Sequence, residues 1–168
     1  MITFILPGYS SRNKDWADEV AKNLKLDGQI RPIYWDHWKD ESQTFKPKEK
    51  AELIIRHSKG ETMNMVAKSV GTLVAALITK EIPKRINKII LCGIPTVSEE
   101  RLKIFREAFS NFPPEKIIVF QNKKDPFATD IEVKEYMKKV NPKIKVVSKE
   151  RSGHNYPYYE EFNNYLIS

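Results

Sequence analysis

Three residues that can act together in acyl transfer lie far apart in the sequence: Ser69, Asp125 and His154. Serine supplies a nucleophilic oxygen, and histidine is a base that can accept its proton. Aspartate can hold the imidazole in the correct tautomer and stabilise its protonated form. Each residue alone has a simpler explanation: a serine that begins a helix, an Asp-Pro turn and a surface-loop histidine. Only their joint placement points to catalysis.

Ser69 lies in the segment Ala67-Lys68-Ser69-Val70-Gly71, which matches the pattern G-x-S-x-G except that Ala67 replaces the first glycine. Small residues are needed on both sides of such a serine because a strand turns there abruptly into a helix. The turn is expected to strain the serine backbone. The N–H of Val70, in the first turn of the helix, can then bind a developing oxyanion.

The elements that must position these residues alternate along the chain as short apolar runs and amphipathic segments. The apolar runs predict strands over residues 2–6, 30–35, 62–67, 86–92, 117–121 and 144–147. The amphipathic segments predict helices over residues 16–24, 47–58, 70–80, 96–109, 133–140 and 158–167. Pro32 suggests that the second strand lies at an edge, and Thr96 with Glu99 resembles a capping box for the fourth helix.

This alternation predicts a single domain, residues 1–168, of α/β class. We expect a doubly wound, predominantly parallel six-stranded sheet with helices on both faces and no large lid. Ligands of such sheets bind at the carboxyl ends of the strands. Ser69, Asp125 and His154 directly follow the third, fifth and sixth predicted strands, so all three are expected at that edge.

The order serine, aspartate, histidine is the one expected of α/β-hydrolases and differs from the trypsin-like and subtilisin-like orders. Nearly the whole chain resembles the small single-domain α/β-hydrolases, a family that includes retinoblastoma-binding protein 9 and related bacterial serine hydrolases. The residues that carry the resemblance are Leu6-Pro7-Gly8, Lys68-Ser69-Val70-Gly71, Asp125-Pro126-Phe127 and Gly153-His154-Asn155.

The resemblance implies a catalytic triad of Ser69, Asp125 and His154, and an oxyanion hole formed by the backbone N–H groups of Tyr9 and Val70. It implies cleavage of a small acyl ester or thioester through an acyl-enzyme, without metal or cofactor. Two residues depart from the family pattern: Ala67, and Lys68 where histidine often precedes the serine. Lys68 is expected to be exposed, with the alternative that its charge lies near the active centre and favours acidic substrates.

The composition restricts the other function classes. The formal net charge is +7, but basic residues are spread over the chain and mixed with acids, so a lysine-rich surface explains them better than nucleic-acid binding. Cys92 is the only cysteine, and no apolar run has the length of a signal peptide or a membrane span. We therefore expect a cytoplasmic protein that acts on a small molecule. No sequence pattern predicts its oligomeric state.

The sequence leaves open the role of two groups of apolar and aromatic residues, and two alternative functions of the protein. Leu102, Phe105, Phe109 and Phe112 either pack on the sheet, as we expect, or line a shallow acyl pocket. Tyr156 and Tyr158 are expected to be packing residues rather than an entrance. The main alternative function is a catalytically idle hydrolase fold used for binding. A phosphate site at residues 8–11 is disfavoured because the segment lacks the dinucleotide and P-loop glycine patterns.

Overall fold

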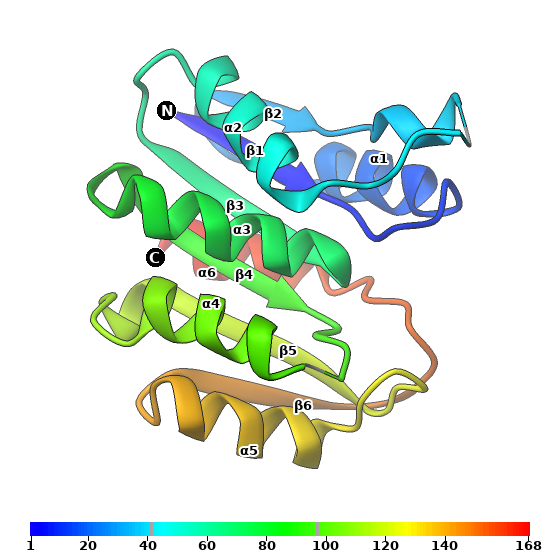
Figure 1. Ribbon diagram of the computed structural model, residues 1–168, viewed down its shortest axis with the longest axis vertical. Helices are drawn as coiled ribbons and strands as arrows, with labels where there is room; N and C mark the ends of the chain where they lie inside the picture. The colour runs from blue at the N-terminus through cyan, green and yellow to red at the C-terminus, as the bar shows by residue number, and fades with distance from the viewer. Residues whose placement is uncertain (41, 97) are drawn as a thin grey trace.

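A single parallel sheet of six strands forms the centre of the molecule, in the order β2-β1-β3-β4-β5-β6 (Figure 1). This computed structural model describes residues 1–40, 42–96 and 98–168. The strands are β1 (Ile2–Leu6), β2 (Gln29–Pro32), β3 (Met63–Lys68), β4 (Ile86–Cys92), β5 (Ile117–Lys124) and β6 (Lys145–Ser152). The α-helices are α1 (Asn13–Asn23), α2 (Pro47–His57), α3 (Val70–Glu81), α4 (Glu99–Phe109), α5 (Asp130–Val140) and α6 (Tyr159–Ile167).

The helices cover both faces of the sheet, so the predicted doubly wound α/β architecture is confirmed. Helices α2 to α5 lie on one face, and α1 and α6 lie on the other (Figure 1). Strands β1 and β3 are buried along their whole length, as expected for strands covered on both sides. Because every strand pair is parallel, the carboxyl ends of all six strands meet at one edge.

The predicted strand at residues 30–35 is the shortest in the structure, at residues 29–32, and ends at Pro32. It pairs only with β1, which confirms the edge position that the proline suggested. Strands β5 and β6 extend to Lys124 and Ser152, beyond their predicted apolar ends. The added residues are polar, including the buried Asn122 and the exposed Lys123 and Lys124, so no apolar pattern marked them.

The expected capping box at Thr96 and Glu99 is wrong. The N-cap of α4 is Ser98, whose Oγ accepts from the N–H of Arg101. Thr96 instead bonds to the Phe127 carbonyl with its N–H, at 3.0 Å, and with its hydroxyl, at 2.6 Å. A threonine side chain can cap a helix or bond to a loop carbonyl, and here Thr96 bonds to the loop after β5.

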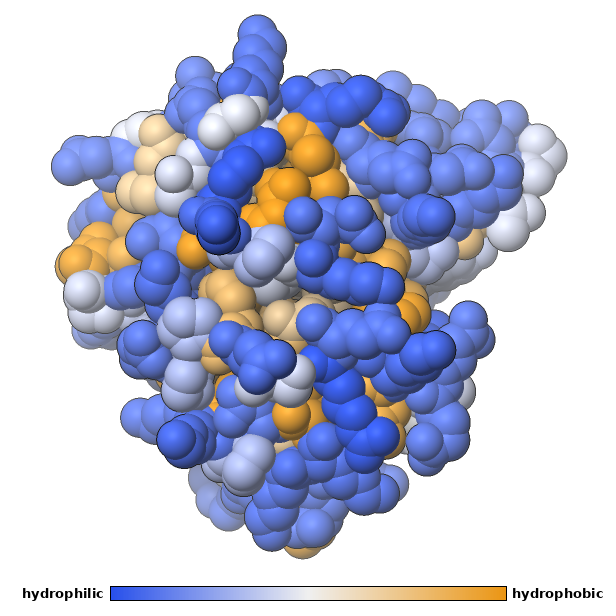
Figure 2. Space-filling model, turned by 60° about the vertical axis from the view of Figure 1, so that its left-hand side comes forward, coloured by the Kyte–Doolittle hydropathy of each residue, from blue (hydrophilic) through white to orange (hydrophobic). Residues whose placement is uncertain are grey.

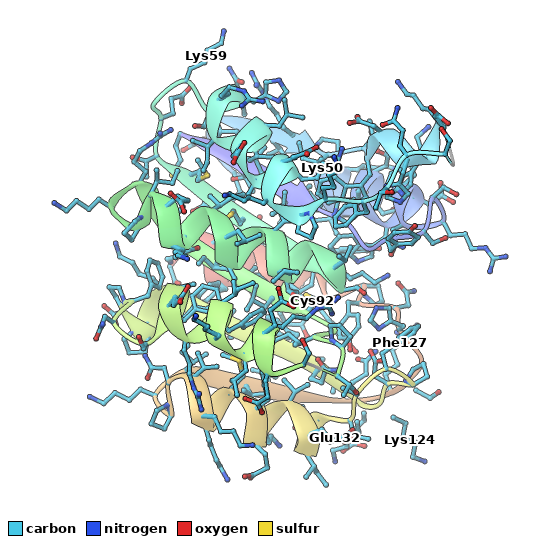
Figure 3. The ribbon with its side chains drawn as sticks, in the orientation of Figure 1. Lys50, Lys59, Cys92, Lys124, Phe127 and Glu132 are labelled. Atoms are coloured by element: carbon cyan, nitrogen blue, oxygen red, sulfur yellow. The ribbon has the colours of Figure 1, made fainter. Side chains whose placement is uncertain are left out.

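The face shown in Figure 2 is mostly hydrophilic, with apolar residues in small areas between the polar side chains. In Figure 3, Lys59 points away from the body of the protein, whereas Cys92 lies among the strands. No helix in the described ranges has the length and apolar character needed to cross a membrane.

Candidate active site

Ser69 occupies the single residue between β3 and α3, and its backbone is strained there. Its φ is +54° and its ψ is −121°, a region that non-glycine residues rarely adopt. Its N–H donates to the Cys92 carbonyl at 3.0 Å, and its own carbonyl accepts from the N–H of Thr72. These bonds hold the turn on both sides.

Gly71 is needed because the first turn of α3 touches the end of β1. A Cβ at this position would lie 2.2 Å from the Leu6 carbonyl oxygen and 2.9 Å from that of Pro7. No side chain fits against these backbone atoms. Ala67, fully buried in β3, shows that a methyl group is accepted where the sequence pattern has its first glycine.

Asp125 and His154 lie together at the ends of β5 and β6, as the parallel topology requires. The Nδ1 of His154 lies 2.7 Å from Oδ2 of Asp125. A carboxylate at this distance places the ring proton on Nδ1 and leaves a lone pair on Nε2. Nε2 is buried and has no hydrogen-bond partner among the described residues. The imidazole therefore has the tautomer of a general base.

Two further donors hold the Asp125 carboxylate. The Tyr156 hydroxyl donates to Oδ2 at 2.5 Å, and the Phe127 N–H donates to Oδ1 at 2.9 Å. Burial opposes ionisation of Asp125, but the bonds from His154, Tyr156 and the Phe127 N–H lower the pKa of its carboxyl. Burial also raises the pKa of Tyr156 far above its usual value, so this hydroxyl is a donor at every working pH.

Asn122, fully buried in β5, holds the loop that carries His154. Its Nδ2 donates to the carbonyls of Gly153 and Asn155, both at 2.9 Å. Its Oδ1 accepts from the Tyr158 hydroxyl. The amide thus fixes the backbone on both sides of the histidine. Sequence reasoning missed this residue because a polar side chain inside a strand has no periodic signature.

Gly93 leaves room for the imidazole ring. It has a φ of +57°, and a Cβ here would lie 2.8 Å from Cε1 of His154 and 2.6 Å from Cε2 of Tyr156. The sequence feature that could have revealed this role of Gly93 is its position directly after the apolar strand β4, at the edge of the sheet where ligands bind. Tyr156 and Tyr158 are both buried, which confirms the prediction that they pack rather than line an entrance.

The loop after β1 is tied down by its carbonyl groups. Trp35 Nε1 donates to the carbonyls of Pro7, at 3.2 Å, and Gly8, at 3.1 Å. The C=O and the following N–H of a trans peptide point in opposite directions, so the Tyr9 N–H is turned away from Trp35. Among the described residues this N–H donates to nothing. An unpartnered N–H is what the predicted oxyanion role of Tyr9 requires.

The Tyr9 carbonyl is itself an acceptor for His37 Nε2 and Trp38 Nε1, each at 2.7 Å. His37 is buried and its ring stacks on that of Tyr9, with 4.5 Å between centroids. On the other side of the site, Val70 is the first residue of α3, so its N–H has no partner within the helix. Neither expected oxyanion donor therefore has a backbone hydrogen-bond partner among the described residues.

Lys68 is not exposed, contrary to the expectation from sequence. Only 6% of it is accessible, because β3 turns this side chain toward α1 rather than toward solvent. Its ammonium donates to Asn13 Oδ1 at 2.8 Å and lies 5.4 Å from the centre of the Trp16 ring. Burial lowers the pKa of Lys68 to about 8, although the negative charge of Asp125 opposes the shift.

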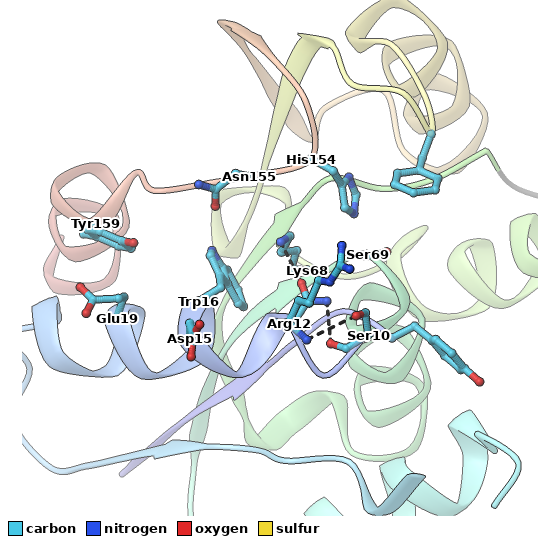
Figure 4. Close-up of a pocket in the computed structure, with 13 residues that line it drawn as sticks. Ser10, Arg12, Asp15, Trp16, Glu19, Lys68, Ser69, His154, Asn155 and Tyr159 are labelled. Atoms are coloured by element: carbon cyan, nitrogen blue, oxygen red, sulfur yellow. Dashed lines mark hydrogen bonds between the residues drawn. The ribbon is translucent and has the colours of Figure 1, made fainter. Parts of the chain in front are cut away.

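These groups surround one pocket of about 800 Å³ at the carboxyl edge of the sheet (Figure 4). Ser69, His154, Tyr9 and Lys68 all line it. Within the described part of the chain, no hydrogen bond joins the Ser69 hydroxyl to His154. Phe127, labelled at this edge in Figure 3, is half exposed and packs against His154 with ring centroids 4.6 Å apart.

The apolar residues between β4 and β5 do not reach the pocket. Leu102, Phe105, Phe109 and Phe112 are buried in the core with the helices on the α3 side of the sheet, which confirms the packing interpretation. The residues that the structure describes also contain no group of three or more side chains able to hold a metal ion. The pocket is lined by Lys68 at the end of β3, by the loops after the strands, and by α1 and α6.

Comparison with known proteins identifies the fold. No family model matches the sequence, and no curated protein matches it. Solved structures do match over 99% of the chain. Est1E from Butyrivibrio proteoclasticus, solved with ferulic acid, has a TM-score of 0.75 at 10% identity, with 88% of its own chain covered.

A naproxen esterase from Bacillus subtilis has a TM-score of 0.72 at 10% identity, with 82% of that chain covered. A CIB-like hydrolase from Thermoplasma acidophilum has a TM-score of 0.66 at 18% identity, with 84% of that chain covered. The architecture and these similarities together define the class: the chain has the α/β-hydrolase fold.

Proposed function

We propose that this protein is a serine hydrolase that cleaves a small acyl ester or thioester, with Ser69 as nucleophile, His154 as base and Asp125 as supporting acid. One observation carries the proposal. His154, fixed through Nδ1 by a buried carboxylate, lines the same pocket as a serine in a strained strand-to-helix turn. The esterases with the same fold support the reaction class. The motifs around Gly8, Ser69 and His154 support membership of the small single-domain family.

The chemistry is a two-step acyl transfer. His154 Nε2 accepts the proton of the Ser69 hydroxyl as its oxygen attacks the carbonyl carbon. The N–H groups of Val70 and Tyr9 bind the oxyanion, and Asp125 stabilises the imidazolium. His154 then returns the proton to the departing alcohol or thiol. Water, activated by the same histidine, attacks the acyl-enzyme and releases the acid.

The absence of a Ser69–His154 bond in the free protein is compatible with this mechanism, because such bonds often form only once substrate is bound. The bonds that Trp35, His37 and Trp38 make to the Pro7–Tyr9 carbonyls support a preorganised oxyanion hole. Losing one such donor typically lowers turnover by roughly 10²–10³-fold.

Labelling with a fluorophosphonate probe tests the proposal. The native protein should be labelled at Ser69, and Ser69→Ala should not react. His154→Ala and Asp125→Asn should react slowly or not at all, since the serine is then less nucleophilic. A folded native protein that is not labelled would contradict the proposal and favour an idle fold used for binding.

A further inference from the structure

Lys68 is a buried cation that the acyl-transfer mechanism does not use. It directly precedes Ser69 and is almost fully enclosed, yet it lines the pocket. Burying a charge without a counter-charge is costly, so a buried ammonium normally has a carboxylate beside it. No ion pair to Lys68 exists among the residues described; its one hydrogen-bond partner is the neutral amide of Asn13.

The acid and the thiol nearest to it do not fill that role. Asp125 already accepts from His154, Tyr156 and the Phe127 N–H, and it makes no ion pair with Lys68. Cys92, on the neighbouring strand, is fully buried, and burial raises the pKa of its thiol well above the usual value, so it carries no charge. The ammonium has three protons and donates one to Asn13, so its remaining donors are free for a ligand.

A second cation reaches the same end of the pocket. Arg12, just before α1, extends into the pocket toward Ser69 and His154 (Figure 4). It is exposed to solvent and makes no ion pair with a carboxylate in the described ranges. Two cations without counter-charges therefore lie at the end of the pocket where the scissile bond must sit.

The opposite end of the pocket carries the opposite charge. Glu19 lines it from the second turn of α1, on the side of Tyr159 (Figure 4), whereas Asp15 lies in the first turn, three residues after Arg12. An anionic group far from the reacting carbonyl would meet the Glu19 carboxylate and be repelled. An anionic group near the carbonyl would meet Lys68 and Arg12. The distribution of charge thus limits how far the anion can lie from the reacting carbon.

We propose that the substrate is an ester or thioester whose acyl group carries a carboxylate a few carbons from the scissile carbonyl, and that Lys68 and Arg12 bind that carboxylate. The inference rests on the proposed function and adds its substrate class. Charge-assisted hydrogen bonds from a buried ammonium are strong in a site shielded from water. The carboxylate would also supply the counter-charge that Lys68 lacks.

Hydrolysis of matched 4-nitrophenyl esters tests this proposal. The native protein should cleave the hemisuccinate or hemiglutarate with higher kcat/KM than the neutral butyrate and pentanoate. The preference should fall by roughly 10- to 100-fold in Lys68→Met and also fall in Arg12→Gln. Lys22→Met removes the same charge from α1 outside the pocket and should keep the preference. The hemisuberate, with its longer chain, should lose the advantage, and Glu19→Gln should restore part of it.

Binding of the free acids to Ser69→Ala gives a readout that does not depend on turnover. Glutarate should raise the melting temperature more than butyrate does, and Lys68→Met should abolish the difference. A native protein that cleaves butyrate and hemiglutarate equally would overturn the substrate class and leave the hydrolase intact. If no ester is cleaved, the proposed function fails, and equal shifts by glutarate and butyrate would then overturn the anion site as well.

Discussion

Asn122 holds His154 through the backbone rather than through the imidazole: one side-chain amide donates to the carbonyls of the residues before and after the histidine. Because the amide lies in β5, the position of the histidine is coupled to the rigid centre of the sheet. Asp125 directly follows the end of the same strand, three residues later. One strand therefore positions both Asp125 and the loop that carries His154.

Asn122→Ala should lower kcat by roughly 10-fold or more, because a misplaced catalytic group costs rate even when substrate still binds. Two buried carbonyls would also lose their donor, so stability should fall by about 1–3 kcal/mol. Asn141→Ala is the matched control: its Nδ2 also donates to two carbonyls, those of Phe109 and Ser110, far from the pocket. The control should lose stability but keep kcat.

Gly93→Ala should reduce activity by displacing the imidazole. The added methyl group would meet Cε1 of His154 at 2.8 Å, and the positive φ adds backbone strain. Gly60→Ala separates the two effects, because Gly60 has a φ of +86° but no atom within 4 Å of the added Cβ. Kinetics of both variants with a neutral ester should show a large loss of kcat only for Gly93→Ala. Equal activity in the two variants would contradict the contact.

Tyr156→Phe removes one of the bonds that keep the Asp125 carboxylate ionised. The Asp125 pKa should rise toward its usual value. A lowered pKa in the folded state stabilises the protein above the unfolded pKa, near 3.9, and this contribution disappears as pH falls through the folded value. The native protein should thus be more stable than the variant near pH 7, and the gap should narrow below about pH 4.

Urea unfolding at several pH values measures that gap. Tyr165→Phe, which removes a hydroxyl bonded to the Glu115 carbonyl away from the pocket, serves as the control. Its cost should not depend on pH in the acidic range. A gap that stays constant down to pH 2 for Tyr156→Phe would mean that the tyrosine does not act through the carboxylate.

Lys68→Met should stabilise the free protein. Its pKa of about 8 lies below the usual 10.5, a difference that corresponds to roughly 3 kcal/mol of unfavourable burial at neutral pH. Loss of the bond to Asn13 offsets part of this, so a gain of about 1–2 kcal/mol is expected. Below pH 8, Lys68 is protonated in both the folded and the unfolded chain, so the full cost of burying the charged ammonium reduces stability.

As pH rises from 8 toward 10.5, the folded chain loses the Lys68 proton first and the penalty disappears. The stability advantage of Lys68→Met should therefore shrink over that range in thermal unfolding experiments. Lys22→Met should show no such dependence, because Lys22 is exposed on α1. A variant less stable than the native protein at pH 7 would show that the ammonium contributes net stability where it lies.

The sequence predicted the order and type of the elements because parallel strands and amphipathic helices have clear apolar periods. It also placed Ser69, Asp125 and His154 at one edge, since each follows a strand. It could not predict the burial of Lys68 or the role of Asn122. Those depend on which way a polar side chain turns inside a strand and which loop it meets, and neither has a periodic pattern. The prediction that Thr96 caps α4 was wrong for a related reason: contacts between loops distant in sequence leave no local pattern.

The contact of Gly71 with the Leu6 carbonyl also bears on how this site can change. It joins the serine turn to the segment that leads into the Tyr9 loop, so the proposed nucleophile and the proposed oxyanion donors belong to one packed unit. In a saturation library at position 71, selection for activity should retain glycine alone. Diversification toward new substrates must then come from the walls of the pocket, at positions such as Arg12, Asp15, Glu19 and Phe127, where side chains vary without disturbing that unit.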